Sequence, residues 1–176
     1  MALDTDLVTA LVRDVVDFPE EGVVFKDITP LLADEAAFAS CVAALADAFS
    51  GAAVDKVVGI EARGFIVAAP VALRLGAGFV PVRKAGKLPW QVERESYTLE
   101  YGTGCLEIHS DALAAGERVL VVDDVLATGG TASAVTRLAG RLGSEVVGFG
   151  CILELGFLGG RARLDGLRIE SLVRYP

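Results

Sequence analysis

The sequence predicts an α/β fold in which a mainly parallel central sheet is flanked by helices. Short runs rich in Val and Leu alternate along the chain with segments whose apolar residues recur at helical spacing. This alternation is typical of strand–helix–strand crossovers, which join parallel strands. The apolar runs are nearly continuous, as expected for strands covered on both faces. The chain has 176 residues, of which 53% are hydrophobic, so we expect one domain spanning residues 1–176.

Strands and helices can be assigned from these patterns. The expected strands are residues 56–61, 78–84, 118–124 and 145–153. The expected helices are residues 34–49, residues 64–76, which Gly76 closes, and a segment with Val135, Leu138 and Leu142 that Gly143 stops. A glycine just past the last periodic apolar residue is a common helix end, because it accepts a left-handed backbone.

The N-terminal region is predicted to hold one helix and a loop. Leu7, Leu11 and Val15 recur every four positions, which predicts a helix that ends before Pro19. Residues 19–32 are expected to be a loop, because a glycine and two prolines bracket a short apolar stretch.

Composition argues against several classes of protein. The net charge of −8 disfavours nucleic-acid binding through overall charge, although a local basic cleft for a small anion stays open. The three cysteines lie far apart without a C-x-x-C pair, which favours buried, reduced thiols in a cytoplasmic protein. His109 is the only histidine, so one chain has no multi-histidine metal site, and we expect an ordinary polar residue near a strand end.

No targeting or membrane segment is expected. The N-terminus carries early acids and no basic segment before an apolar block, unlike a signal peptide. The longest apolar run, residues 65–82, contains Pro70, Arg74, Gly76 and Gly78. These residues favour a buried helix, a turn and a strand over a membrane span.

Residues 84–103 form a long, charged insertion between two expected strands. Such insertions are unusual in a compact domain and are often functional. We expect a hairpin within it, around the sequence SYTLEYG.

The most informative motif is VLVVDDVLATGGTA, in which a strand runs into two acids and a small-residue turn. Asp123 and Asp124 repel each other, so a ligand is needed to explain them; paired carboxylates suit the vicinal hydroxyls of a sugar. The turn at residues 127–131 lies between a strand and a helix, where free N–H groups can hold a phosphate. The local chemistry therefore indicates a sugar with a phosphate at one end.

Other nucleotide-binding loops do not fit this chain. The turn lacks the lysine that a P-loop requires. Gly148 and Gly150 begin a dinucleotide-binding pattern, but its third glycine is missing.

The acidic motif resembles the phosphoribosyl-pyrophosphate motif of type I phosphoribosyltransferases. Further segments are similar to members of that family that act on adenine, in the same order: DFPEEGVVFKDITPLL, GIEARGFIVAAPVA, VPVRKAGKLP and YTLEYGTGCLEIHSDAL. RKAGKLP and YTLEYG together indicate adenine. The resemblance covers nearly the whole chain from about Asp17 and implies the type I phosphoribosyltransferase fold, with a flexible lid hairpin at about residues 84–103.

The resemblance implies a purine salvage reaction. Adenine and phosphoribosyl pyrophosphate would give AMP and pyrophosphate, with oxocarbenium-like charge on the ribose as the bond to C1′ breaks. It also implies Mg²⁺, held mainly through substrate oxygens rather than by protein ligands, and a homodimer.

Site residues follow by the same resemblance. Asp123 and Asp124 would contact the ribose hydroxyls. The 5′-phosphate would be held by Ala127, Thr128, Gly129, Gly130 and Thr131. Pyrophosphate would be held by Arg63, which is also a catalytic candidate, and by Arg83, Lys84 and Lys87. A cis peptide is implied at Ala62–Arg63 or its neighbour.

The remaining assignments concern the base and the lid. Adenine would be held by Val24, Phe25, Lys26 and Leu126. Glu100 would accept a purine proton as the catalytic base, with Tyr101 beside it in the lid. Without the resemblance, Phe25 fits core packing equally well, and Glu100 fits a solvated hairpin.

Two rival functions remain at this stage. A non-catalytic regulator could use the same fold to sense phosphoribosyl pyrophosphate or a purine, although no DNA-binding domain is visible. A second rival is an enzyme with another base preference, such as hypoxanthine or xanthine.

Overall fold

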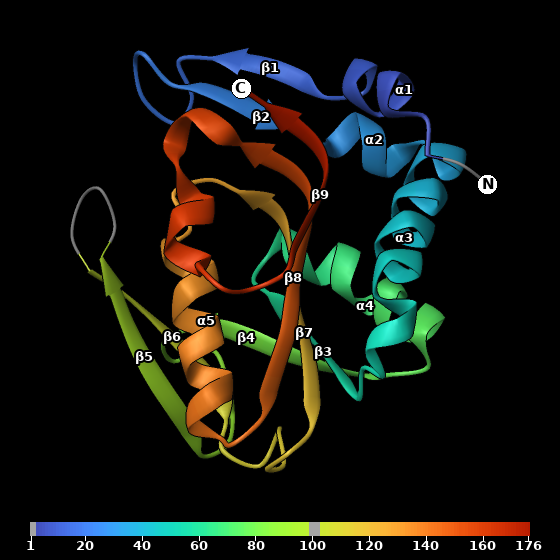
Figure 1. Cartoon of the computed structure of the whole chain (residues 1–176). Coiled ribbons are helices and arrows are strands. Elements are labelled where there is room, and N and C mark those ends of the chain that lie inside the picture. Colours follow the sequence, from blue (N-terminus) through green and yellow to red (C-terminus); the bar gives the residue numbers. More distant parts are fainter. Residues whose placement is uncertain (1–2, 99–102) are drawn as a thin grey trace.

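A seven-stranded sheet forms the centre of the molecule in the computed structural model, which describes residues 3–98 and 103–176 (Figure 1). The strand order is β5-β6-β4-β3-β7-β8-β9. The parallel strands are β3 (Lys56–Ile60), β4 (Gly78–Lys84), β7 (Arg118–Leu126), β8 (Glu145–Leu155) and β9 (Ile169–Tyr175). Antiparallel pairing adds β5 (Val92–Thr98) and β6 (Thr103–His109) at one edge. The predicted mainly parallel α/β fold is confirmed.

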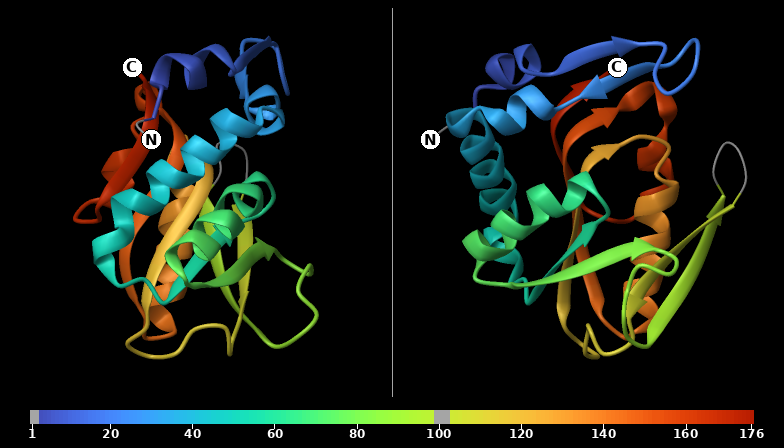
Figure 2. Two further views of the ribbon diagram at one scale, coloured as in Figure 1. Left: turned by 90° about the vertical axis from the view of Figure 1, so that its right-hand side faces the viewer. Right: turned by 180° about the vertical axis from the view of Figure 1, so that it is seen from behind.

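Helices cover both faces of this sheet (Figure 2). On one face, α3 (Glu35–Phe49) and α4 (Arg63–Leu75) pack with Leu120 and Val122 of β7 in one core cluster. On the other face, α5 (Gly130–Arg141) packs with Val119 and Val121 in a second cluster. Consecutive residues of a strand point to opposite faces, so the apolar run of β7 supplies both clusters.

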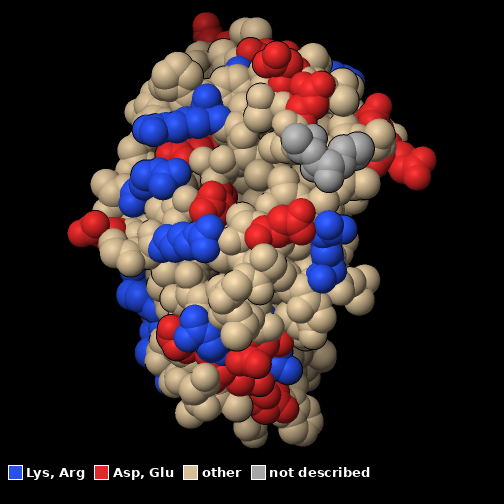
Figure 3. All heavy atoms as spheres, turned by 45° about the vertical axis from the view of Figure 1, so that its right-hand side comes forward, with Lys and Arg blue, Asp and Glu red and all other residues tan. Residues whose placement is uncertain are grey.

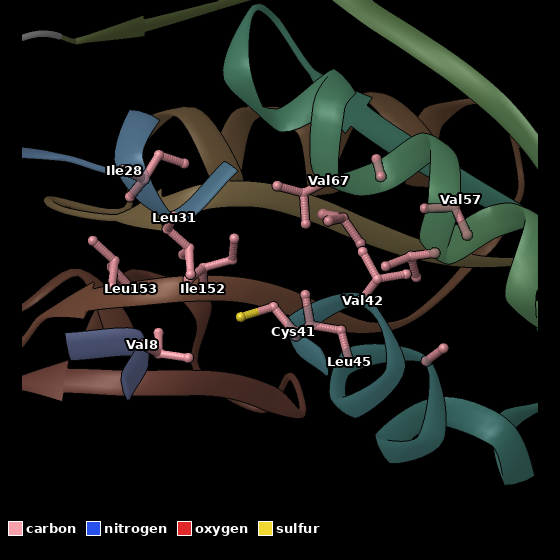
Figure 4. Close-up of a cluster of buried hydrophobic side chains, with 14 of the residues drawn as sticks. Val8, Ile28, Leu31, Cys41, Val42, Leu45, Val57, Val67, Ile152 and Leu153 are labelled. Atoms are coloured by element: carbon pink, nitrogen blue, oxygen red, sulfur yellow. The ribbon is translucent and has the colours of Figure 1, made fainter. Parts of the chain in front are cut away.

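The first core cluster joins distant parts of the chain (Figure 4). Cys41 and Leu45 of α3 and Val67 of α4 meet Ile152 of β8, and all four are fully buried. Burying such a side chain stabilises the fold by roughly 1.5–3 kcal/mol relative to leaving it exposed.

The main helices begin and end close to where the sequence predicts. Asp34 caps α3 by accepting a hydrogen bond from the Ala37 N–H at 2.9 Å, as N-cap aspartates do. Gly76 ends α4 with φ of 69°. β7 and β8 continue past their predicted ends to Leu126 and Leu155. β9 was not predicted.

The N-terminal prediction is wrong in two places. α1 (Thr5–Ala10) is short, and Val15 lies in β1 (Arg13–Val16) rather than in a helix. Residues 19–32 are not one loop, because they contain β2 (Val24–Asp27) and most of α2 (Thr29–Ala33). β1 pairs with β2, with Val15 opposite Phe25. Cross-strand pairing between residues ten apart therefore outweighs the weak helical spacing.

The predicted hairpin is present and longer than expected. β5 pairs with β6 from Val92 opposite His109 onward, and residues 99–102 lie outside the described part of the chain. Glu95 fastens the hairpin to α5, where it accepts hydrogen bonds from Arg137 at 2.6 Å and from Arg141. Glu107, 1% exposed, accepts a hydrogen bond from Arg94 at 2.7 Å.

The expectation of buried thiols is met at Cys41 and Cys151 but not at Cys105. Cys41, Cys105 and Cys151 are free thiols, and two of them are buried. Basic and acidic side chains are interspersed on the face drawn in Figure 3. Within residues 3–98 and 103–176, every helix is too short or too polar to cross a membrane. Short turns complete the fold: η1 (Ser50–Ala52), η2 (Gly156–Leu158) and η3 (Gly160–Leu164).

Candidate active site

The acidic pair lies inside β7, near the carboxyl end of the parallel strands. We expected the strand to end on Asp123 and Asp124, but pairing with β8 continues to Leu126. Gly64, at the start of α4, faces the pair: a Cβ there would lie 2.6 Å from Oδ1 of Asp123. This glycine lets the beginning of α4 approach the carboxylates closely, so the helix and the strand edge form one site.

Arg63 is the cation closest to the acidic pair. Its Nε lies 2.8 Å from Oδ2 of Asp124, and its guanidinium lies 4.8 Å from the centre of the Phe25 ring. Asp124 is only 5% exposed, and the contact is not aligned as a hydrogen bond, so Oδ2 accepts none from residues 3–98 and 103–176. The ion pair offsets the charge, while the oxygen can still accept a hydrogen bond from a ligand.

The pKa of Asp123 is raised in this site. Burial raises the pKa of its carboxyl well above the usual range, and the negative charge of neighbouring Asp124 raises it further. The N–H of Asp124, which donates to Oδ1 at 2.9 Å, opposes this shift only in part. Its side chain still borders the site cavities, so a ligand hydroxyl can reach it.

The phosphate loop, residues 127–131, encloses a cavity of about 70 Å³. Gly129 has φ of 77° and precedes the first turn of α5. The first N–H groups of a helix have no acceptor within it, and the helix dipole favours an anion there. The loop brings together all five residues predicted to bind a 5′-phosphate: Ala127, Thr128, Gly129, Gly130 and Thr131.

A second cavity, of about 260 Å³, lies between α4 and the β4 edge. Arg63 and Lys84 line it, together with Glu61, Tyr97 and both site aspartates. Arg83 and Lys87 are not among its lining residues. The Arg83 Nε donates instead to Glu61 at 2.9 Å, and its Nη1 donates to the Lys87 carbonyl at 3.2 Å.

A third cavity, of about 290 Å³, adjoins the other side of the acidic pair. Val24, Phe25 and Lys26 line it as predicted for the base, with Arg63 between them and the acids. The Lys26 Nζ donates to Asp14 at 2.6 Å, so the ammonium group of this lysine is already paired.

The prediction for Leu126 does not fit this geometry. Leu126 is buried in the core cluster on the α5 side and borders only the phosphate-loop cavity. Val125 and Leu155 line the base cavity instead. Neighbouring residues of a strand face opposite sides, so Leu126 points away from the base cavity that Val125 lines.

Comparison with known proteins identifies the family of this chain. The phosphoribosyl transferase domain family matches residues 28–163. An adenine phosphoribosyltransferase of Streptomyces coelicolor is 59% identical over 173 residues, covering 96% of this chain and 95% of the relative. The chain belongs to the adenine phosphoribosyltransferase family.

Solved structures of that family have the same fold. One from Thermoanaerobacter pseudethanolicus gives a TM-score of 0.95 at 48% identity, covering 98% of this chain and all of the other. One from Giardia lamblia, complexed with 9-deazaadenine, gives 0.93 at 35% identity, covering 100% and 99%. These are adenine phosphoribosyltransferases by name.

Sequence reasoning missed some site residues of this phosphoribosyltransferase. Glu61 accepts hydrogen bonds from Arg83 and from the Lys84 N–H at 3.2 Å; an acid at a strand end was the available signal. The Glu61–Ala62 peptide is cis; it is the neighbour of Ala62–Arg63, and the resemblance implied a cis bond at one of these positions. Tyr97 and Leu155 gave no signal, because only the fold brings them to the cavities. Glu100 and Tyr101 lie outside the described residues.

Proposed function

We propose that this chain transfers the phosphoribosyl group of phosphoribosyl pyrophosphate to adenine, giving AMP and pyrophosphate in purine salvage. The observation that carries the proposal is that Asp123 borders three adjoining cavities. One suits a 5′-phosphate, one a pyrophosphate and one a flat base, which supports a ribose beside the carboxylates between them. The names of the relatives support adenine as the base.

Each cavity has the chemistry that its part of the substrate needs. The phosphate loop offers backbone N–H groups to the 5′-phosphate. Arg63 and Lys84 offer positive charge to the pyrophosphate, which leaves with developing negative charge. Phe25 offers an aromatic face to the purine, which is a common way to hold a flat ring.

The acidic pair serves ribose binding and the reaction. Asp124 keeps a buried acceptor oxygen available for a ribose hydroxyl. The carboxylates also favour positive charge on the ribose as the bond between C1′ and pyrophosphate breaks. Glu100, whose role rests on the resemblance, would take the N9 proton of adenine as that nitrogen bonds to C1′.

We also propose a magnesium ion that enters with substrate, as the resemblance implies. Mg²⁺ would bind through pyrophosphate oxygens and water, because it is a hard cation that keeps several waters and is commonly held through substrate phosphates. When bound, it would neutralise charge on the leaving group.

We also propose a homodimer that uses the outer surface of α4. Ile66, Pro70 and Leu73 follow one another at helical spacing, and Ile66 and Leu73 are 47% and 83% exposed. A groove of about 610 Å³ runs beside them, between α3 and α4. Contiguous exposed apolar surface of this kind marks interaction sites. Sedimentation of Leu73→Glu beside the parent chain tests the assignment; a variant that remains dimeric would contradict it.

A cytoplasmic location is part of the proposal. Free thiols at Cys41, Cys105 and Cys151 suit a reducing compartment.

The activity is tested with purified protein, Mg²⁺ and phosphoribosyl pyrophosphate, mixed with adenine, hypoxanthine, guanine or xanthine in separate reactions. We expect AMP and pyrophosphate in equal amounts from adenine, and slower product formation from the other bases. Product from hypoxanthine or xanthine alone would show a different base preference. Tight binding of phosphoribosyl pyrophosphate with no product from any base would favour the regulator.

A further inference from the structure

The segment after β8 approaches the phosphate loop closely through its backbone. In two views it lies at the start of α5 (Figures 1 and 2). A Cβ on Gly160 would lie 2.1 Å from the Ala127 carbonyl oxygen and 2.8 Å from the Gly129 nitrogen. A Cβ on Gly129 would lie 2.3 Å from the Gly160 carbonyl oxygen. The two backbones touch so closely that the position of Gly160 sets the position of the loop.

An ion pair with a buried glutamate fixes the residue next to Gly160. Glu154, near the end of β8, is 2% exposed. Arg161 donates from Nε to its Oε1 at 3.0 Å and from Nη2 to its Oε2 at 2.6 Å. This two-point contact restricts both the distance and the orientation of Arg161. The Ser171 hydroxyl donates to Oε2 at 2.7 Å, which ties the pair to β9.

The charge state of Glu154 keeps this contact in place. The hydrogen bond from Arg161 lowers the pKa of the carboxyl, and the Ser171 hydroxyl also lowers it. The glutamate is therefore ionised at neutral pH and remains paired with the guanidinium.

We propose that Glu154 and Arg161 are positioning residues for the phosphate loop. They hold Gly160 against Ala127 and Gly129, and the loop N–H groups stay directed at a 5′-phosphate. This inference rests on the proposed function, because it assumes that the loop binds such a phosphate. Neither residue borders the three site cavities, so their effect passes through the backbone contact.

The test compares Arg161→Lys with Arg163→Lys. Arg163 is exposed on the same turn and serves as the matched control. Lysine keeps the charge but loses the planar two-point contact, and we expect about tenfold weaker binding of ribose 5-phosphate by calorimetry. The KM for phosphoribosyl pyrophosphate should rise by a similar factor, with little change in the KM for adenine.

A second variant tests the backbone contact itself. Gly160→Ala adds one methyl group that the loop cannot accommodate, whereas Gly140→Ala adds one that meets no atom within 4 Å. Thermal unfolding of each variant confirms that it is folded at the assay temperature. We expect Gly160→Ala, but not Gly140→Ala, to weaken ribose 5-phosphate binding.

The outcomes separate the inference from the proposed function. Folded Arg161→Lys and Gly160→Ala proteins that bind ribose 5-phosphate as the parent does would overturn the inference, even if adenine is converted. A parent protein that binds ribose 5-phosphate without converting adenine would sink the proposed function, while weaker binding by both variants would still support the positioning role. A parent protein that does not bind ribose 5-phosphate overturns both.

Discussion

The phosphate loop and the β5–β6 hairpin both border the cavity beside the acidic pair, and they are held by different forces. The loop is fixed by backbone contact, because neither Gly129 nor Gly160 has room for a side chain. The hairpin is fastened to α5 by Glu95 with Arg137 and Arg141, whose side chains remain 50% and 44% exposed. Close packing resists displacement, whereas exposed ion pairs contribute little and can exchange with water.

This difference suits the two tasks proposed for the site. A 5′-phosphate is bound before and after the reaction, so its loop can remain fixed. The proposed lid must open for substrates and products. Leu106 and Ile108 of β6 lie in the core, so only the ion-paired contacts of Glu95 can separate without repacking it. The following predictions test whether one half of the site is rigid and the other is readily released.

The largest effect is expected for Asp124→Asn, which alters the fixed half. Losing one charged hydrogen bond to ribose, worth roughly 1.5–3 kcal/mol, should lower kcat/KM for phosphoribosyl pyrophosphate about 10- to 150-fold. Asp111→Asn, at an exposed turn, is the control and should retain full activity. Steady-state kinetics measures both. An unchanged kcat/KM for Asp124→Asn would reject the ribose role.

A large loss of stability is expected for Gly129→Ala. Its φ of 77° costs an alanine roughly 1–2 kcal/mol, and the clash with the Gly160 carbonyl oxygen adds to that. Gly140→Ala, within α5, should instead gain up to about 1 kcal/mol from helix propensity. Urea unfolding compares the two variants. Equal free energies of unfolding for Gly129→Ala and Gly140→Ala would mean that the loop accommodates the added methyl group.

Much of this fixed half could be predicted from sequence. The acids and the small-residue turn are consecutive in VLVVDDVLATGGTA, so local chemistry was enough to indicate a sugar phosphate. Asp34 and Gly76 likewise marked helix ends, because capping depends on residues close in the chain.

The rest depends on contacts that local patterns do not encode. Gly160 contacts the loop although about thirty residues, including all of β8, separate the two in sequence. Leu155, at the end of β8, lines the base cavity for the same reason. Val15 was assigned to a helix because its strand partner, Phe25, could not be recognised from spacing. Leu126 was misplaced because β7 continues beyond the acids, which determines the face of each later residue.

A smaller effect is expected for Glu95→Gln, which alters the releasable half. Surface ion pairs contribute roughly 0–1 kcal/mol each, so global stability should fall by about that amount. Hydrogen exchange should rise in β5 and β6 while the phosphate loop keeps its protection. Glu93→Gln, exposed on the same strand, is the control. Faster exchange in the loop as well would mean that the two halves are coupled.

The smallest effect, a dependence on pH, should have opposite signs in the two halves. Hydrogen bonds from Arg137 and then Arg141 lower the pKa of Glu95, so its stabilisation is present above the ordinary glutamate value of roughly 4.3. That stabilisation is lost as pH falls through the lowered pKa. Below that pKa, the parent and Glu95→Gln should show the same hydrogen-exchange protection in β5 and β6. Burial raises the pKa of Asp123, so ionising this carboxyl at neutral pH destabilises the folded state. Protonation at lower pH removes that cost.

Asp123→Asn should therefore be more stable than the parent at neutral pH, with the difference shrinking as pH falls through the raised pKa of Asp123. Urea unfolding at several pH values measures this difference, and hydrogen exchange corrected for intrinsic rates measures the hairpin. If acidification stabilised or destabilised both halves alike, the two halves would not be held by different forces. If acidification instead weakens the hairpin while it relieves the cost of Asp123, the loss of the hairpin contact follows from protonation of Glu95.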